Sequence, residues 1–236
     1  MMKTFYELQE GLYDPNIFKA FFLAGGPGSG KSYVAGRTMG GHGLKTVNAD
    51  EAFERLLKKA NMSLKIPTPS PGGKSRFDPE KDKEYKRYMG VRDKAKDITK
   101  ARQANYLEGR LGVVIDGTGK DANKILGQKS GLEELGYDTY MVFVNTSLDV
   151  ALQRNAERAR SVPEPIMVKA WKDVQSNIGK FSNMFRAGFI VVDNNDAGED
   201  IFNQVSKRVR GLLRKKVTNT RAKSWMAAEL ARKQRK

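Results

Sequence analysis

One short segment constrains the fold more strongly than any other part of the 236-residue chain. An apolar run from Phe18 to Ala24 has the length and composition of a buried strand. The residues that follow it are Gly25-Gly26-Pro27-Gly28-Ser29-Gly30-Lys31-Ser32. They fit the pattern G-x-x-x-x-G-K-[ST] completely, and the pattern predicts a strand, a tight turn and a helix from about Lys31 to Met39.

The residue types in this turn are those that a phosphate group requires. Gly25, Gly28 and Gly30 lack side chains that would prevent backbone N–H groups from wrapping around an anion. The helix that follows directs the positive end of its dipole toward the same point. Lys31 adds a cation for the β- and γ-phosphates, and Ser32 offers a hydroxyl to Mg²⁺. We therefore expect a nucleotide-binding loop rather than a glycine-rich turn that matches by chance.

Strand-like and helix-like segments alternate along the rest of the chain. Strands are expected at 18–24, 44–49, 111–115, 137–145 and 189–192. Helices are expected at 4–12, 31–39, 51–60, 80–108, 122–135, 147–160, 166–178 and 201–213. The apolar stripe of the longest helix is Tyr88, Val91, Ala95, Ile98, Ala101, Ala104 and Leu107. The alternation predicts an α/β fold, in which helices cover both faces of a parallel sheet.

Two of the expected strands end in a carboxylate. Asp50 follows the second strand and Asp116 ends the third, and open parallel sheets bind their ligands beyond these carboxyl ends. Asp50 could accept a proton from an attacking hydroxyl, or it could merely cap the helix that begins at Glu51. Asp116 has the Walker-B form of a Mg²⁺ ligand. Thr118, in the next turn, either donates to a substrate or belongs to a plain turn.

An arginine-rich segment follows the fourth expected strand. Arg154 and Arg158 share one face of a helix, Arg160 lies just beyond them, and Val162-Pro163 interrupts the helical pattern. Guanidinium groups placed over a nucleotide stabilise the charge that spreads over oxygens during phosphoryl transfer. The spacing is compatible with a lid that closes over the site and equally with a solvated basic helix.

Composition excludes several classes of site and singles out the C-terminus. The chain has no cysteine and one histidine, His42, so thiolate zinc sites and cysteine nucleophiles are excluded. No apolar run has the length of a membrane helix and no signal-peptide core is evident, so we expect a cytoplasmic protein without a membrane partner. Of the net charge of +16, residues 207–236 supply twelve basic residues and one acid.

This basic segment has three possible interpretations. It could be an arm that binds nucleic acid, with Trp225 stacked on a base. It could also be a solvated helix, or a helix that packs Trp225 and Leu230 against the body of the protein.

The region between the second and third strands is where a phosphate acceptor is expected to bind. Residues 63–79 are rich in proline, glycine and serine and predict a loop, which precedes the long helix. Basic residues gather here around Tyr85 and Tyr88, namely Lys74, Arg76, Lys81, Lys83, Lys86 and Arg87. They indicate an anionic acceptor, or an exposed helix whose acids balance the charge.

Together the motifs resemble the P-loop kinase family that includes zeta toxins and bacteriophage polynucleotide kinases. The resemblance covers roughly residues 18–206 and rests on the phosphate loop, Asn48-Ala49-Asp50, Val114-Ile115-Asp116-Gly117-Thr118 and the segment 145–160. It implies a sheet of order 2-3-1-4-5, ATP·Mg²⁺ as the donor, and transfer of the γ-phosphate to a hydroxyl. It further implies that Asp50 activates the hydroxyl and that Arg154, Arg158 and Arg160 belong to a lid. The nucleotide contacts that it implies are 25–33, which includes Tyr33, and Asn194 after the fifth strand.

We therefore expect a P-loop kinase domain over 1–206 and a basic helical tail over 207–236. The domain would contain an acceptor insertion at about 61–109 and a lid at about 147–179. The expected acceptor is a nucleotide, a sugar nucleotide or a similar small anionic molecule. The alternatives are a polynucleotide 5′-hydroxyl kinase and a nucleic-acid-binding P-loop ATPase without a small acceptor.

Overall fold

The structure is a computed structural model, and it describes residues 12, 14–64, 83–157 and 162–234. Of the expected segments, the helix at 4–12 and most of the 63–79 loop lie outside these residues. Within the part described, no helix is both long and apolar enough to cross a bilayer.

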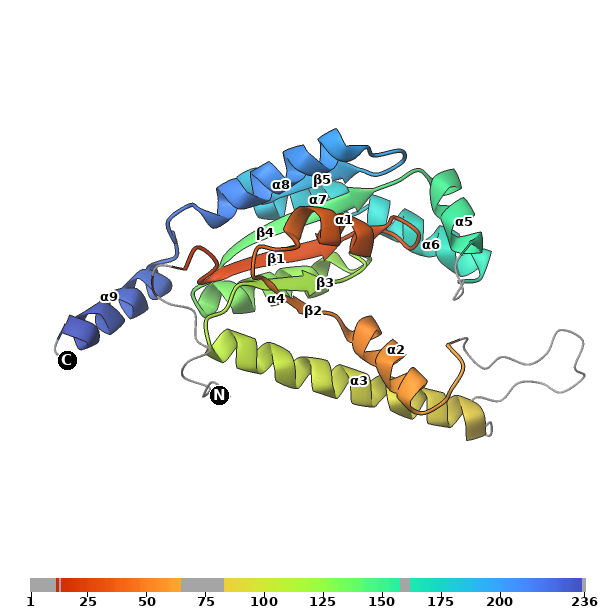
Figure 1. Ribbon diagram of the computed structural model, residues 1–236. Helices are drawn as coiled ribbons and strands as arrows, with labels where there is room; N and C mark the ends of the chain where they lie inside the picture. Colours follow the sequence, from red (N-terminus) through yellow and green to blue (C-terminus); the bar gives the residue numbers. More distant parts are fainter. Residues whose placement is uncertain (1–11, 13, 65–82, 158–161, 235–236) are drawn as a thin grey trace, which may run out of the picture.

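A five-stranded parallel sheet forms the centre of the molecule (Figure 1). Its strand order is β2-β3-β1-β4-β5, which confirms the expected fold class. The strands are β1 (Lys19–Ala24), β2 (Lys45–Val47), β3 (Val113–Asp116), β4 (Asp138–Asn145) and β5 (Phe189–Asp193). Because all five strands run in the same direction, their carboxyl ends lie at one edge of the sheet. The glycine-rich turn follows β1 and therefore lies at that edge.

Helices connect the strands and cover both faces of the sheet. They are α1 (Lys31–Met39), α2 (Ala49–Lys59), α3 (Lys83–Glu108), α4 (Ala122–Glu134), α5 (Leu148–Ala156), α6 (Glu164–Gln175), α7 (Ile178–Phe185), α8 (Glu199–Leu213) and α9 (Thr220–Gln234). The expected helix at 166–178 corresponds to α6, which ends at Gln175, and the helix α7 that follows it was not predicted. Where the expected break at 161–165 lies, α5 ends at Ala156 and α6 begins at Glu164.

Successive residues of β1 alternate between two cores. Phe21 and Leu23 join an apolar cluster with α1 and α8 on one face of the sheet. Ala20, Phe22 and Ala24 join a cluster with α4 and α7 on the other face. The period of two follows from strand geometry, and burial on both faces explains why β1 is apolar almost throughout.

The helices α2 and α3 form a third unit beside β2, the edge strand, with a small core of its own (Figure 1). Phe53 and Tyr88 pack edge to face, with ring centroids 5.0 Å apart. The expected stripe on α3 is right at Tyr88 and Ala95 but wrong at Ala101 and Ala104, which are exposed. Thr99 is buried instead, because α3 passes from α2 toward the sheet and the face that it buries changes along its length.

The C-terminal helix α9 is attached at the amino end of β4. Asp138 accepts a hydrogen bond of 2.6 Å from the Thr218 hydroxyl and further bonds from the backbone N–H groups of Thr218 and Asn219. The indole of Trp225 packs edge to face on Phe18, with centroids 5.4 Å apart. The interpretation in which Trp225 and Leu230 pack against the body of the protein is thus confirmed for Trp225, whereas Leu230 is not part of that core cluster.

Candidate active site

The register of the sheet brings three loops together. Leu23 lies opposite Asp116, and Val47 lies opposite Ile115. The phosphate loop after β1, Asp116 at the end of β3 and the residues after β2 are therefore neighbours. Gly25 N–H donates to Thr118 O (3.2 Å), which fastens the start of the phosphate loop to the turn after Asp116.

The phosphate loop is wrapped so tightly that side chains are excluded from it. A Cβ on Gly25 would lie 2.5 Å from Val144 O, and a Cβ on Gly30 would lie 2.5 Å from Asn194 Nδ2. Gly28 has a left-handed φ of 74°, and a Cβ there would lie 2.4 Å from Ala151 O. A side chain at these positions would therefore clash with backbone carbonyls, at Gly25 and Gly28, or with the side chain of Asn194, at Gly30.

Gly28→Ala should distort the loop, lower nucleotide affinity and destabilise the protein by about 1–3 kcal/mol, because the new methyl group overlaps a carbonyl. Gly36→Ala in α1 is the matched control, since a Cβ at Gly36 has no neighbour within 4 Å. That substitution should stabilise by about 0.5–1 kcal/mol through helix propensity. Urea unfolding and nucleotide titration of both variants give the comparison, and equal behaviour of the two would contradict this account of the loop.

Lys31 lies within the loop that it is expected to complete. Its ammonium donates to Gly25 O (2.9 Å) and Gly26 O (3.3 Å). Ser32 is exposed at the start of α1. The Ser29 hydroxyl is buried and has no hydrogen-bond partner in the described part of the chain. A loop with a cation, a free buried hydroxyl and the amino end of α1 is suited to an anion.

Two carboxylates and Lys31 are electrostatically coupled beyond the strand ends. Burial raises the pKa of Asp116 above its usual value, the Lys31 ammonium lowers it, and the charge of Asp50 raises it again. Asp50 itself is exposed in the first turn of α2. The structure thus brings Lys31, Asp50 and Asp116 together, with one carboxylate partly buried and one exposed.

Asn48 is the residue that links these groups, and sequence reasoning did not assign it a role. Its Nδ2 donates to Asp116 Oδ2 (2.7 Å), while its Oδ1 accepts from Asp50 N (2.8 Å) and Glu51 N (3.2 Å). Asn48 therefore caps α2, and the alternative in which Asp50 caps a helix starting at Glu51 is wrong. The signal was present, because Asn48 and Glu51 have the spacing of a capping box.

The residues at this edge fit a divalent cation. Two neighbouring carboxylates repel each other, and burial disfavours the charged form of Asp116. A bound cation would offset both effects. Among the described residues, no cluster of three or more acidic or histidine ligands forms a complete protein cage. This composition is typical of Mg²⁺ sites, which draw most of their oxygen ligands from phosphates and water. Asp116 and Ser32 are the residues that would hold the ion.

Arg154 and Asn194 support the phosphate loop from the side of β5. Asn194 is buried and donates from Nδ2 to Ser29 O (2.8 Å). Arg154 donates to Asn194 O (2.7 Å) and Asn195 O (2.9 Å), which holds its guanidinium beside Gly30. These bonds position the loop, and contact of either residue with a nucleotide stays a prediction.

The structure describes only some of the other residues that are expected to contact the nucleotide or to form the lid. Tyr33 is 58% exposed and packs edge to face on Phe202, with its ring centroid 5.4 Å away. Arg158 and Arg160 lie outside the described residues. Gly26 is buried and Pro27 is half-buried, and their contact with a nucleotide also stays a prediction.

Helix α6 is held against the phosphate loop by contacts that sequence reasoning did not find. Trp171 Nε1 donates to Thr146 O (3.0 Å), and a Cβ on Gly26 would lie 3.4 Å from Trp171 Cδ1. Gln175 Nε2 donates to Asn145 Oδ1 (2.8 Å) at the end of β4. No local pattern marks these partners, because each contact joins segments that are distant in sequence.

Two solved structures with TM-scores of 0.50 or more support the fold. An AvrRxo1-ORF1:AvrRxo1-ORF2 complex gives a TM-score of 0.53 at 13% identity, covering 80% of this chain and 63% of that chain. A Pnkp1/Rnl/Hen1 RNA repair complex gives 0.50 at 20% identity, covering 70% and 47%. A shikimate kinase from Bacteroides thetaiotaomicron gives 0.47 at 12% identity, covering 84% and 99%. This chain thus spans less than two thirds of the first two matched chains, and no curated protein sequence matches it.

A family model identifies the chain more specifically. The model AAA_33, described as an AAA domain, matches residues 21–180. This range begins in β1, includes the phosphate loop, Asp50, Asp116 and Arg154, and ends in α7. Because the match covers more than half of the sequence, the chain belongs to the AAA_33 family of P-loop kinase-like domains.

Proposed function

We propose that the protein transfers the γ-phosphate of ATP to a hydroxyl group of a small anionic acceptor, such as a nucleotide or a sugar nucleotide. The observation that carries the proposal is the coupling of Lys31, Asp50 and Asp116 at the carboxyl ends of three adjacent strands. A loop that only bound a nucleotide would not need the second, exposed carboxylate. Family membership and the motif resemblance to zeta toxins and phage polynucleotide kinases support a kinase of that type.

Each residue of the site has its own role in the proposed reaction. The loop amides and Lys31 bind the β- and γ-phosphates and draw negative charge toward the β–γ bridging oxygen. Asp50 orients the acceptor hydroxyl and takes its proton as the oxygen attacks the γ-phosphorus. The bond from the γ-phosphorus to the bridging oxygen then breaks, and ADP leaves. Mg²⁺, when held by Asp116 and Ser32, supplies positive charge to the phosphate oxygens.

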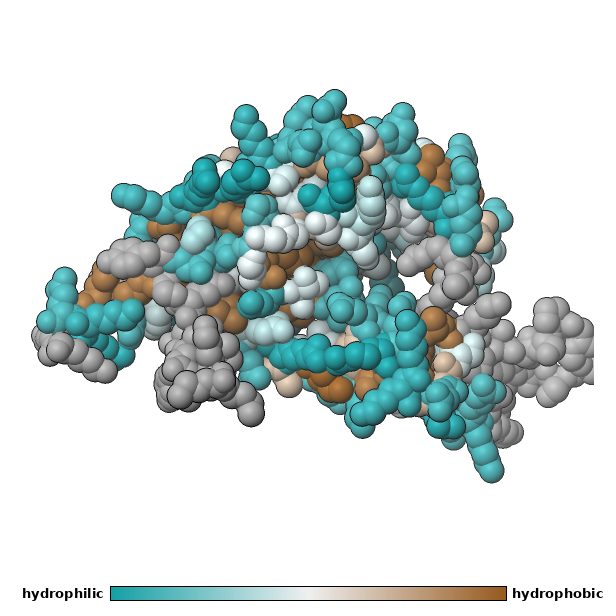
Figure 2. Space-filling model, viewed as in Figure 1, coloured by the Kyte–Doolittle hydropathy of each residue, from teal (hydrophilic) through white to brown (hydrophobic). Residues whose placement is uncertain are grey.

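The side chain of Asp50 is exposed, so an acceptor can approach it. The space-filling view is hollowed between the sheet and the α2–α3 pair (Figure 2). Asp50 stands at the start of α2, beside this hollow, whereas Asp116 is partly buried behind Asn48. The exposed carboxylate is therefore the one that can reach an acceptor hydroxyl.

The position of α9 favours a small acceptor over a polynucleotide that is gripped by the basic tail. Helix α9 is attached to Asp138 at the amino end of β4, whereas the phosphate loop lies at the carboxyl ends of the strands (Figure 1). The eight residues of β4 span about 26 Å at roughly 3.3 Å per residue. A strand bound to α9 would have to run the length of the sheet to place its 5′-hydroxyl at Asp50. Nucleic-acid binding by residues 207–236 remains a separate prediction.

One labelling experiment tests the proposal against its alternatives. The full chain is incubated with γ-labelled ATP, Mg²⁺ and, in separate reactions, nucleosides, nucleotides, sugar nucleotides or 5′-hydroxyl oligonucleotides. Label on a small anionic acceptor is the expected result. Label on oligonucleotides alone would favour the polynucleotide kinase, and release of free phosphate without any labelled acceptor would favour the ATPase. Either result would overturn the small-acceptor proposal.

A further inference from the structure

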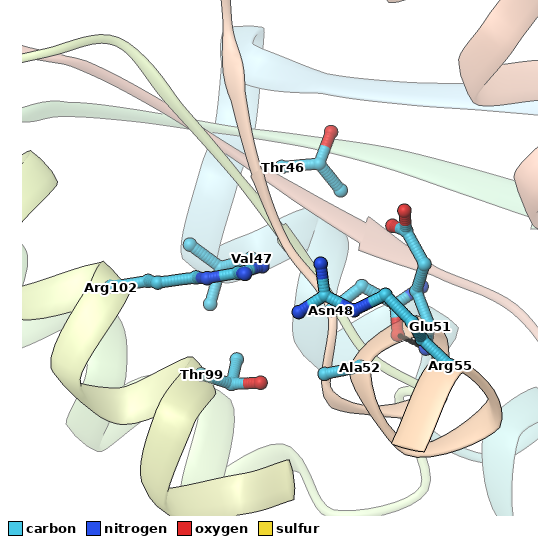
Figure 3. A pocket seen from close by; sticks show the side chains of 8 residues that line it. All are labelled: Thr46, Val47, Asn48, Glu51, Ala52, Arg55, Thr99 and Arg102. Atoms are coloured by element: carbon cyan, nitrogen blue, oxygen red, sulfur yellow. Dashed lines mark hydrogen bonds between the residues drawn. The ribbon is translucent and has the colours of Figure 1, made fainter. Parts of the chain in front are cut away.

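A small cavity lies between the end of β2 and the two helices α2 and α3 (Figure 3). Its volume is about 40 Å³, and the side chains that matter for its chemistry are Thr46, Asn48, Glu51, Arg55, Thr99 and Arg102. A cavity of this size has room for one compact group of a few atoms. The polar lining indicates that this group is hydrophilic.

Two guanidinium groups from different helices converge on the cavity. Arg55 extends from α2 and Arg102 from α3 toward the same space, while the Glu51 carboxylate points to the other side (Figure 3). Neither arginine has an ion-pair or hydrogen-bond partner among the residues that the structure describes. Both side chains are exposed, so water screens part of the repulsion between their charges, and an anion bound between them would offset the rest. Guanidinium groups match the geometry of carboxylate and phosphate groups, which they bind through paired N–H donors.

The cavity lies next to the proposed proton acceptor. Asn48 and Glu51, on either side of Asp50 in sequence, both line it. Asn48 also bonds directly to Asp116. A group bound between the arginines therefore lies next to the start of α2, where Asp50 stands.

We propose that Arg55 and Arg102 bind the anionic group of the phosphate acceptor, a phosphate or a carboxylate, and so place a nearby hydroxyl of the same molecule at Asp50. This inference rests on the proposed function for the identity of the ligand, because the acceptor is defined by the reaction. It assigns the choice of acceptor to a pair of residues that the sequence motifs do not include. The negative charge of Glu51 partly offsets the positive charge of the two arginines.

Binding of inorganic phosphate tests the arginine pair without requiring catalysis. The full chain, labelled with ¹⁵N, is saturated with Mg²⁺ and a non-hydrolysable ATP analogue so that the phosphate loop is filled, and phosphate is then titrated. Amide shifts in α2 and α3 report binding at the cavity. Arg55→Gln and Arg102→Gln should each weaken this binding about tenfold or more, the range for a lost charge-assisted hydrogen bond. Glu51→Gln should strengthen it.

Charge-matched controls separate a specific site from general attraction. Lys58→Gln and Lys100→Gln remove one exposed positive charge from the same two helices, outside the cavity. They should change phosphate affinity by less than about twofold, because their charges lie outside the cavity and water screens them from it. Equal weakening by the controls and by the arginine variants would overturn the proposal. So would the absence of shifts in α2 and α3 in a chain that binds the ATP analogue, and the proposed function would then still stand.

Acceptor kinetics distinguish the possible anionic groups. Hydroxyl compounds that carry a phosphate, a carboxylate or no charge are compared as acceptors of label from ATP. Arg102→Gln should raise the KM for the preferred charged acceptor about tenfold while leaving its KM for ATP unchanged. Equal KM values of the wild type for charged and uncharged acceptors would contradict the assignment. If no compound accepts label but phosphate still shifts α2 and α3, the kinase proposal fails and the anion site stands.

Discussion

Asp50→Asn should lower the rate of phosphoryl transfer by about 10²- to 10⁴-fold, the usual contribution of a positioned general base. Asparagine keeps the size of the side chain and its ability to accept a hydrogen bond from the acceptor, but it cannot take the proton. Asp50 is exposed, and among the described residues its carboxylate makes no hydrogen bond or ion pair with the phosphate loop, so ATP affinity should change less than about twofold. Single-turnover transfer from labelled ATP, together with calorimetric titration of the nucleotide, measures both quantities.

The pKa of the neighbouring Asp116 provides a second measurement on the Asp50→Asn variant. Because the charge of Asp50 raises the pKa of Asp116, its removal should lower the pKa of Asp116, which carbonyl-carbon NMR can follow. Asp97→Asn, an exposed position on α3, is the control and should leave the transfer rate unchanged. A transfer rate for Asp50→Asn within about threefold of the wild type would remove Asp50 from the mechanism.

Asp138→Ala should destabilise the protein by about 3–5 kcal/mol and release α9 from the sheet. Asp138 and Lys19 form an ion pair of 2.9 Å, with side-chain exposures of 7% and 1%. Removing one partner leaves the other as an uncompensated buried charge, and this accounts for most of the expected loss. The hydrogen bonds from Thr218 and Asn219, which fix the start of α9, are lost as well. Urea unfolding measures the free energy, and protection of α9 amides from hydrogen exchange measures the release.

An exposed ion pair gives the matched control. Lys169 and Asp173 lie four residues apart on α6, with exposures of 79% and 42%. Asp173→Ala should cost less than about 1 kcal/mol, because water screens that pair. Similar losses for the two variants would show that the Asp138–Lys19 pair does not stabilise the fold in the way proposed.

The lowered pKa of Asp138 predicts that the protein loses stability at acidic pH. Burial alone raises the pKa of Asp138, but hydrogen bonds from Thr218 and Lys19 and the charge of Lys19 outweigh burial and hold it below the usual 3.8. A lowered folded-state pKa means that the contribution to stability is present above the unfolded-state pKa. It is lost as the pH falls from about 3.8 through the folded-state pKa. The Asp138→Ala variant should lack this part of the acid dependence.

The parts of the structure that sequence predicted well are those that local patterns determine. The run before Gly25 and the loop after it specify strand, turn and helix within a few residues, and β1 and α1 have nearly the predicted bounds. Because β1, β3 and β4 are buried on both faces, their sequences are short apolar runs, which are easy to recognise. The strand order, in contrast, came from resemblance to a family, since no local pattern says which strands are neighbours.

The parts that sequence missed depend on contacts between distant segments. The break between α6 and α7 occurs where Asn177 Nδ2 donates to Gly119 O and Lys120 O, in a turn more than 50 residues away. Arg154 was assigned from its position on a helix, but its observed partners are carbonyls after β5. Arg55 and Arg102 are unremarkable in sequence, and only the packing of α2 against α3 brings both to one cavity.

Nucleotide binding by the phosphate loop is the claim on which the proposed reaction depends, and calorimetric titration with Mg²⁺ and a non-hydrolysable ATP analogue tests it most directly. The wild-type chain should bind one molecule of the analogue. Lys31→Ala should lower the affinity about 10- to 100-fold through loss of a charge-assisted hydrogen bond, while Lys124→Ala, an exposed lysine of α4, should not. No binding by the wild type, or equal affinity of the wild type and Lys31→Ala, would contradict the account.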